Sequence, residues 1–293
     1  MELIDHPVVQ RLRRIKQLGL TDLVYPGALH TRFHHAVGAM HLMGKALDVL
    51  RSKGVEISQE EKTAAQSAIL LHDVGHGPFS HALEFTLLQG IQHESLSFLI
   101  MKRLNEELNN ELSLAMRMFQ NTYERKFFHQ LISSQLDIDR LDYLKRDSFF
   151  TGVSEGSIGL ERIVTMLNVV EDEIVVEEKG IYSIENFLNA RRLMYWQVYL
   201  HKASVSAEKM LINLFSRARD LTESGESIPS SPILKLFLKN RHTLADFQEN
   251  TAVLDAYCKL DDYDIWGSVK HWQSADDHIL KLLSNMLLER KLF

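Results

Sequence analysis

Hydrophobic residues recur at intervals of three and four along most of the chain, which is typical of amphipathic helices. Proline is scarce, with 5 residues in 293, so few points force a helix to end. The pattern predicts helices over 8–18, 34–50, 93–108, 125–146, 156–168, 184–218, 232–240 and 275–290. We therefore expect a mainly α-helical protein.

One further helix has a clear start and a clear end in the sequence. Ser58 is followed three residues later by Glu61, a pair that forms a capping box at a helix N-terminus. The run Gly75-His76-Gly77-Pro78 then interrupts the helix. We expect a helix between these two signals.

Two segments depart from the helical pattern. Residues 173–184 break the helical pattern, and they predict a small β-hairpin that turns at Lys179-Gly180. Residues 222–232 are rich in Ser, Gly and Pro and predict a loop or hinge.

The composition restricts the class of protein. Hydrophobic residues make up 45% of the chain, as in an ordinary globular protein, and the net charge of −6 gives no bulk attraction for nucleic acid. The single cysteine, Cys258, excludes an intrachain disulfide and a cysteine zinc cluster. No apolar run suits a membrane span, and residues 1–14 lack an apolar signal core. We expect a cytoplasmic enzyme.

Ionisable residues occupy helix positions where apolar ones are expected. In the capped helix, His72 and Asp73 continue the apolar stripe of Ala65 and Ala68. In two other predicted helices, His35 shares a face with Ala39, and Asp139 shares one with Ile132, Leu136, Tyr143 and Asp147.

A shared metal ion would explain these four inward-facing groups. A buried carboxylate costs several kcal/mol unless it is paired or binds a cation. A lone buried histidine is more often a core residue, but two histidines and two aspartates together indicate a metal site. Mixed nitrogen and oxygen ligands favour Mn, Fe, Ni, Co or Zn over Mg.

Four runs of sequence carry a family resemblance: QRLRRIKQLG at 10–19, YPGA at 25–28 followed by RFHH at 32–35, LHDVGHGPFSH at 71–81, and DIDRLDY at 137–143. With these runs the chain resembles the HD-domain deoxynucleoside triphosphate (dNTP) triphosphohydrolases related to the human SAM-and-HD-domain protein and its bacterial homologues. The resemblance implies an HD-domain helical core over 1–220, including the hairpin near 173–184, and a C-terminal helical region over 221–293 that continues the core.

The resemblance also implies a reaction and its residues. The family hydrolyses dNTPs at the α-phosphorus and releases the deoxynucleoside and intact triphosphate. The implied metal ligands are His35, His72, Asp73 and Asp139, which hold one divalent transition metal, while Mg could accompany the triphosphate. The implied catalytic residues are His81 near the α-phosphate, His93 as general acid, and Glu84 in support of that acid. Without the resemblance, His93 could equally be a surface histidine.

The residues implied to bind substrate are Gln17, Arg32, Arg140, Tyr143, Asp147, Arg191 and Tyr199. Arg140 stands where the family commonly has lysine, which keeps the charge and changes the geometry. Tyr195 replaces a family histidine, so no role is carried over to it. From the sequence alone, Tyr195 and Tyr199 could equally be a core aromatic stripe.

Asp5, Gln10 and Arg13 match residues that bind a regulatory guanine nucleotide in activated family members. They imply a GTP or dGTP activator and a homo-oligomer, either a dimer or a tetramer. The alternative is a solvated basic helix face. The family's usual N-terminal segment and further C-terminal lobe are missing here, so we expect part of the regulatory contacts to be absent.

Two other functions remain open. The same metal site could serve an HD phosphohydrolase that acts on another nucleotide or phosphate ester. The chain could also be a nucleotide-sensing or nucleic-acid-binding regulator with weak catalysis, although a sensor has no need of His81 and His93 beside four metal ligands.

Overall fold

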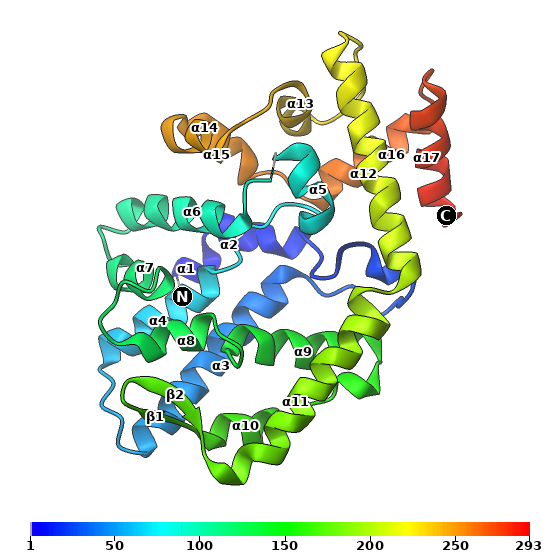
Figure 1. The fold of residues 1–293 in the computed structure, drawn as a ribbon. Coiled ribbons are helices and arrows are strands. Elements are labelled where there is room, and N and C mark those ends of the chain that lie inside the picture. The colour runs from blue at the N-terminus through cyan, green and yellow to red at the C-terminus, as the bar shows by residue number, and fades with distance from the viewer. Residues whose placement is uncertain (1, 89) are drawn as a thin grey trace.

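The chain folds into helices with one small β-hairpin in the computed structural model (Figure 1). The structure describes residues 2–88 and 90–293, without the side chains of Ser80, His81 and Phe85. The α-helices are α1 (Glu2–Asp5), α2 (Pro7–Arg11), α3 (Arg32–Ser52), α4 (Gln59–Leu71), α5 (Ser80–Leu87), α6 (His93–Glu107), α7 (Ser113–Phe119), α8 (Lys126–Ile132), α9 (Ile138–Thr151), α10 (Leu160–Met166), α11 (Ile181–Met194), α12 (Lys202–Glu223), α13 (Pro232–Lys239), α14 (Leu244–Glu249), α15 (Thr251–Tyr257), α16 (Asp262–Trp272) and α17 (His278–Leu288). The short helical turns are η1 (Leu12–Arg14), η2 (Gly19–Leu23), η3 (Ser154–Gly156), η4 (Glu178–Gly180) and the π-helical turn η5 (Tyr195–Tyr199). The mainly α prediction is confirmed.

The capping box at the start of α4 forms as the sequence predicts. Ser58 Oγ accepts the backbone N–H of Glu61 at 3.0 Å, and the Glu61 carboxylate accepts that of Ser58 at 2.7 Å. Helices α3, α6, α13 and α17 also lie close to their predicted ranges. None of the described helices has an apolar stretch of the length that a bilayer requires.

The single helix predicted over 125–146 is wrong, because the chain turns between α8 and α9. Asp137, which is fully buried, holds this turn by accepting the backbone N–H groups of Ser134 and Arg140, each at 2.7 Å. Its carboxylate caps α9 and makes residue 138 a new helix start.

The helix predicted over 184–218 is also interrupted. Helix α11 passes into the π-helical turn η5, and α12 begins only after His201, whose ring nitrogen accepts the backbone N–H of Ala203 at 3.2 Å. The two helices follow one another along one side of the molecule (Figure 1). The predicted helices over 8–18 and 156–168 are shorter than expected, and α14 to α16 are not anticipated at all.

The β-hairpin lies earlier in the chain than predicted. Strand β1 (Leu167–Val170) pairs antiparallel with β2 (Glu173–Val176). The turn is at Glu171-Asp172, where both φ angles are positive, +51° and +64°, as the tight turns favoured in hairpins require. The predicted turn at Lys179-Gly180 instead belongs to η4. The turn contains no glycine, the residue that most often marks such a turn in a sequence.

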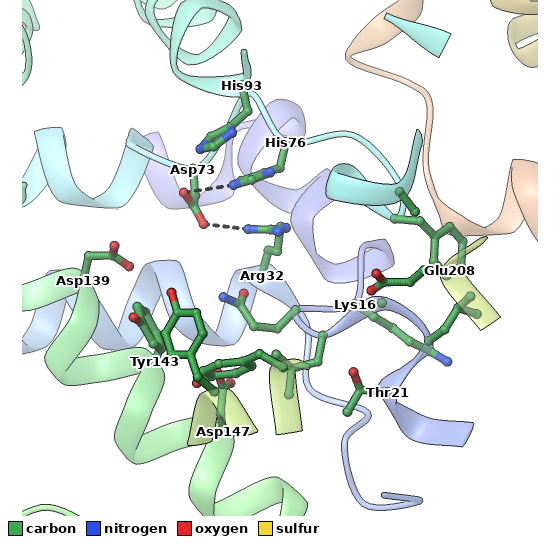
Figure 2. Close-up of a pocket in the computed structure, with 18 residues that line it drawn as sticks. Lys16, Thr21, Arg32, Asp73, His76, His93, Asp139, Tyr143, Asp147 and Glu208 are labelled. Atoms are coloured by element: carbon green, nitrogen blue, oxygen red, sulfur yellow. Dashed lines mark hydrogen bonds and ion pairs between the residues drawn. The ribbon is translucent and has the colours of Figure 1, made fainter. Parts of the chain in front are cut away.

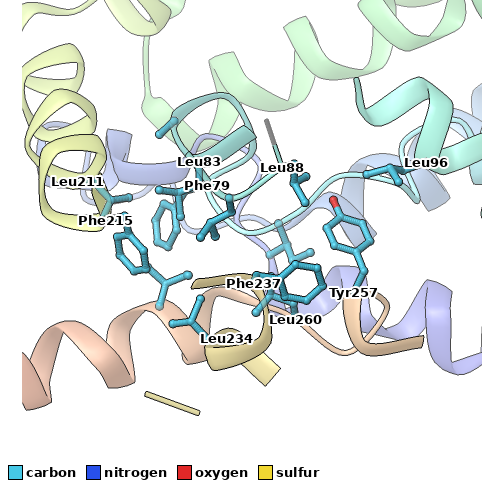
Figure 3. Close-up of a cluster of buried hydrophobic side chains, with 14 of the residues drawn as sticks. Phe79, Leu83, Leu88, Leu96, Leu211, Phe215, Leu234, Phe237, Tyr257 and Leu260 are labelled. Carbon is cyan, nitrogen blue, oxygen red and sulfur yellow. The ribbon is translucent and has the colours of Figure 1, made fainter. Parts of the chain in front are cut away.

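Two hydrophobic clusters form the core, and they meet at the functional residues. One cluster lies among α3, α4 and α7 to α11. The other joins α2, α5 and α6 to α12–α17, and Figure 3 shows part of this second cluster. The boundary crosses α3 between Ala36 and Ala39, and α4 between Ile69 and Leu70. His35 on α3, and His72 and Asp73 after α4, lie close to this boundary and are therefore held between two packed cores. The division of the chain at residue 220 stays a prediction.

Candidate metal centre and pocket

The four predicted metal ligands come together from three helices. His35 lies on α3, His72 and Asp73 follow the last turn of α4, and Asp139 lies in the first turn of α9. Asp139 Oδ1 is 3.1 Å from His35 Nε2 and 3.4 Å from His72 Nε2. Asp73 Oδ1 is 3.3 Å from His72 Nε2. His35, His72 and Asp73 each offer a ligand atom within 4.8 Å of the other two.

The second nitrogen of each imidazole has a partner that fixes the ring. His35 Nδ1 lies 2.8 Å from Asp142 Oδ2, and His72 Nδ1 lies 2.6 Å from the backbone oxygen of Ile69. Both Nδ1 atoms therefore act as donors, which leaves Nε2 as the nitrogen with a free lone pair. Metal-binding histidines are oriented in this way by a carboxylate or a carbonyl behind them.

The donor set fits a divalent transition metal. The Nε2 atoms of His35 and His72 are buried and have no hydrogen-bond partner among the described residues, although each faces a carboxylate. An unsatisfied buried nitrogen is costly, and a cation would satisfy both at once. The prediction of a His/Asp metal site is confirmed, while the choice among Mn, Fe, Ni, Co and Zn stays a prediction.

The electrostatic field of the site also favours a cation. Burial alone would lower the pKa of His35, but the negative charges of Asp139 and Asp142 beside the ring raise that pKa to about 10. Burial opposes ionisation of Asp73, yet His72, His76 and Arg32 hold its pKa well below the usual range. The carboxylates thus draw positive charge onto the imidazoles, and a metal that displaces those protons meets the same demand.

A pocket of about 370 Å³ opens beside these ligands (Figure 2). Asp73 and Asp139 lie at one end of it, and Lys16, Thr21 and Glu208 lie at the other. The predicted residues Gln17, Arg32, His93, Tyr143, Asp147 and Tyr199 line the space. The pocket is therefore elongated, with the metal ligands at one end.

Positive and neutral nitrogen groups surround Asp73 at the metal end. Arg32 donates to Asp73 Oδ2 at 2.7 Å, and His76 Nε2 lies 3.3 Å from Asp73 Oδ1. The His93 ring stacks on His76 with centroids 3.7 Å apart. Burial lowers the pKa of both His76 and His93, which suits neutral imidazoles that exchange protons.

A hydrogen-bonded group of polar residues lines the middle of the pocket. The Tyr199 hydroxyl donates to Asp147 Oδ2 at 2.8 Å, and His30 Nε2 lies 2.7 Å from Asp147 Oδ1. The Tyr143 ring meets that of Tyr199 edge-on, with centroids 6.1 Å apart. Asp147 is almost fully buried, so its carboxylate is held in one orientation.

Two predicted phosphate-binding arginines lie outside the described pocket lining. Arg140 turns back and hydrogen-bonds to Asp137 and to the backbone oxygen of Ser134. Arg191 bonds to Gln135 Oε1 at 3.2 Å. Arg140 would have to leave its helix cap to reach a ligand, so its predicted role lacks support from its position.

The remaining predicted residues lie around the edges of the site. The Glu84 carboxylate accepts the backbone N–H of His93, so it supports the segment that carries this histidine. The side chain of His81 lies outside the described residues, and its role stays a prediction. Gln10 and Arg13 hydrogen-bond to each other at 2.7 Å on the outer face of the chain, near the exposed Asp5, and none of the three lines the pocket.

A fully buried arginine supports the loop that follows the metal ligands. Arg11 donates to the backbone oxygens of Val74 at 3.2 Å, His76 at 2.7 Å and Leu260 at 2.9 Å. The Tyr257 hydroxyl donates to the oxygen of Gly75 in the same loop at 2.7 Å. The N-terminal and C-terminal helices thus both hold the metal loop.

The sequence reasoning missed three residues of the site. Asp142 lies three residues after Asp139 on α9, so helical spacing could have identified it. His76 lies in the loop after α4, where its only signal is its place close to His72 and Asp73. His30, which holds Asp147, lies in a loop and has no periodic signal. Only the contact with α9 reveals it.

Comparison with known proteins agrees with this geometry. A model of the HD domain matches residues 32–147, and a model of the HD associated region matches 158–227. The uncharacterized protein YwfO of Bacillus subtilis is 36% identical over 100% of this chain, which spans about two thirds (66%) of that relative. A deoxynucleoside triphosphate triphosphohydrolase SAMHD1 homolog of Dictyostelium discoideum is 32% identical over 74% of this chain and 46% of its own length.

The crystal structure of a phosphohydrolase from Bacteroides thetaiotaomicron superposes with a TM-score of 0.98. It is 53% identical, and the match covers 100% of this chain and 72% of that one. The chain therefore belongs to the HD domain phosphohydrolases and carries an HD associated region after the HD domain.

Proposed function

We propose that the protein hydrolyses deoxynucleoside triphosphates to the deoxynucleoside and triphosphate, with a divalent transition metal at the His/Asp site. The observation that carries the proposal is one elongated pocket in which the metal ligands adjoin the Tyr143, Asp147 and Tyr199 group. A nucleotide places its phosphates and its sugar next to each other in the same way. The name of the Dictyostelium discoideum relative supports the same substrate class.

The residues in the middle of the pocket would bind the sugar. His30 and the Tyr199 hydroxyl each hold one oxygen of the Asp147 carboxylate, and each oxygen retains a lone pair for a sugar hydroxyl. The Tyr143 ring beside this group would pack against the deoxyribose and leave no room for a 2′ hydroxyl. These contacts select a deoxynucleotide over a ribonucleotide.

The residues at the metal end would act on the phosphates. His35, His72, Asp73 and Asp139 would hold a divalent metal, which would supply Lewis acidity toward a phosphoryl oxygen and lower the pKa of water. Arg32 lies against Asp73 and presents its guanidinium to the α-phosphate. Water would attack the α-phosphorus and the bond to the 5′ oxygen would break. His93 in its protonated form would donate a proton to that leaving oxygen, and the proton that the attacking water releases would restore His93 through solvent.

Product identity tests the proposal. The protein is incubated with dGTP, dATP, dCTP and dTTP and Mn²⁺, and the products are separated by chromatography. We expect a deoxynucleoside and intact triphosphate in equal amounts. Orthophosphate or a deoxynucleoside monophosphate as the first product would refute the proposed bond cleavage and favour another phosphohydrolase activity.

A variant pair links turnover to the metal site. Asp139→Asn should lose bound metal, measured by elemental analysis, together with turnover, because its oxygen faces both metal-binding histidines. Asp48→Asn is the matched control, since Asp48 is an exposed residue of α3 that forms an ion pair with Lys62 of α4. Full turnover by the Asp139→Asn protein would remove this residue from the site.

We also propose that GTP or dGTP regulates assembly through Asp5, Gln10 and Arg13. The support is the exposure of this group and its separation from the pocket lining. Sedimentation velocity with and without GTP is the test, and we expect a larger species with the nucleotide. An unchanged sedimentation coefficient would reject the regulatory site.

A further inference from the structure

The end of the pocket remote from the metal ligands carries an acidic residue with no protein partner. Glu208 lies on α12 and is half-buried where it lines the pocket (Figure 2). Among the described residues, none hydrogen-bonds or ion-pairs with its carboxylate. Burial raises the pKa of Glu208, and only the neighbouring Lys209 acts in the other direction.

The other carboxylates of the pocket have clear partners, unlike Glu208. Asp73 pairs with Arg32, Asp139 faces His35 and His72, and Asp147 is held by Tyr199. A partly desolvated carboxylate without a donor is unfavourable unless a ligand supplies one. Glu208 is therefore a carboxylate of this pocket that is open to a ligand, and Gln17 Oε1 is a neutral acceptor in the lining that also has no hydrogen-bond partner among the described residues.

The walls around this end suit a flat ring. Helix α12 packs against η2 and α5, and the space between them is lined by Leu18, Leu20, Phe79 and Ala82. The other charged group at this end, Lys16, is already paired with Asp22 at 2.7 Å. Apolar walls with few polar groups are typical of a small-molecule site, in which packing supplies affinity and the polar groups supply specificity. A nucleobase has this combination of an apolar face and a polar edge.

The order of the groups along the pocket assigns this end to the base. Asp139 lies at one end, Tyr143 and Asp147 follow, and Glu208 lies at the far end (Figure 2). In a nucleotide, the sugar separates the phosphates from the base. If the phosphates lie at the metal, as the proposed function requires, the base reaches Glu208.

We propose that Glu208 selects the base and that guanine is the base it prefers. Guanine presents two neighbouring donors, N1–H and the 2-amino group, to the two oxygens of a carboxylate. Adenine and cytosine each place a ring-nitrogen acceptor beside the amino group, and thymine flanks its single N–H with two carbonyl oxygens. Guanine alone can make a two-pronged, charge-assisted contact with Glu208.

The proposal rests on the proposed function for the placement of the nucleotide, so its test separates binding from turnover. Binding of dGTP, dITP, dATP, dCTP and dTTP is measured by titration calorimetry in EDTA, where no metal supports hydrolysis. dITP retains N1–H and lacks the 2-amino group. We expect dGTP to bind about 10 to 100 times more tightly than dITP or dATP, the size of one hydrogen bond to a charged group.

Glu208→Gln should reduce this preference to a few fold, because the amide offers one acceptor instead of two. The variant breaks no hydrogen bond or ion pair within the described protein, so we expect an unchanged melting temperature. Glu226→Gln is the matched control, since Glu226 is exposed just beyond the end of α12 and outside the pocket lining. It should keep the full preference for dGTP.

The possible outcomes separate the two proposals. Equal binding of all five nucleotides, binding of none, or a dGTP preference that survives in Glu208→Gln would each overturn the role of Glu208. Equal turnover of all four dNTPs with Mn²⁺ would overturn it too, while the proposed function would stand. Selective binding that depends on Glu208, without turnover of any dNTP, would support Glu208 and refute the proposed function.

Discussion

Replacing Asp142 with Asn should weaken metal binding although Asp142 is not itself a ligand. Asp142 Oδ2 accepts the Nδ1–H of His35 at 2.8 Å and the Nε–H of Arg146 at 2.9 Å. Asp142 Oδ1 accepts a second N–H of Arg146 at 2.7 Å. The carboxylate thus accepts three hydrogen bonds in a buried site and holds the His35 ring toward the metal position.

The expected size of the effect follows from this geometry. An asparagine that keeps its oxygen on His35 must point its amide N–H₂ at the Arg146 donor, and the reverse orientation points it at His35. In either orientation, an N–H of the asparagine amide faces an N–H of a neighbouring side chain. Loss of a carboxylate behind a metal-binding histidine typically weakens metal affinity by about 10 to 100-fold, or about 1.4–2.7 kcal/mol.

The assay is a competition between the protein and a chromophoric chelator for Mn²⁺ or Zn²⁺ at pH 7.5, with folding followed by circular dichroism. Arg146→Met leaves the contact between Asp142 and His35 in place, so its loss of affinity should be smaller. Asp48→Asn should bind metal like the original protein. If Asp142→Asn binds metal within twofold of the original protein, Asp142 does not orient His35.

Three further predictions concern stability. Burial raises the pKa of Asp262 to about 7, above the unfolded value of about 3.9, so its stabilising effect is complete below pH 4 and lost as the pH rises through 7. The free energy of unfolding of Asp262→Asn, measured relative to the original protein in urea, should therefore be about 2–4 kcal/mol higher at pH 8 than at pH 4. The same relative free energy at both pH values would contradict this. Tyr257→Phe removes a buried hydrogen bond to the oxygen of Gly75 and should lower the free energy of unfolding by about 1–2 kcal/mol in the same measurement. An unchanged free energy of unfolding would contradict this and show that solvent replaces the bond. Gly75→Ala would place a Cβ 2.2 Å from the backbone nitrogen of Ser97 and should cost at least about 1–3 kcal/mol, whereas a melting temperature like that of the original protein would show that α6 can move away.

The sequence was most informative where local signals and burial agree. The capping box at Ser58 and the apolar stripe that runs into His72 and Asp73 both predicted features that the structure confirms. The metal ligands could be found because ionisable groups at buried helix positions are rare and costly.

The errors occurred where tertiary contacts override local pattern. Asp137 looks like part of a continuous helix, but its buried carboxylate caps a new one. The hairpin turn at Glu171-Asp172 has positive φ angles without glycine, so the nearest glycine, Gly180, indicated a turn at the wrong place. His30 and Asp147 are 117 positions apart, and no local pattern relates residues at that distance.

The three carbonyl contacts of Arg11 have a consequence for when the site can form during synthesis. The last of them, Leu260, is 249 positions further along the chain. At ribosomal rates of roughly 5–20 residues per second, Leu260 is synthesised about 10–50 s after Arg11. Until then the guanidinium lacks one of its three acceptors, and the loop after Asp73 lacks the support of Tyr257. We expect the nascent chain to acquire its metal only after the C-terminal helices emerge, although all four ligands are made within the first half.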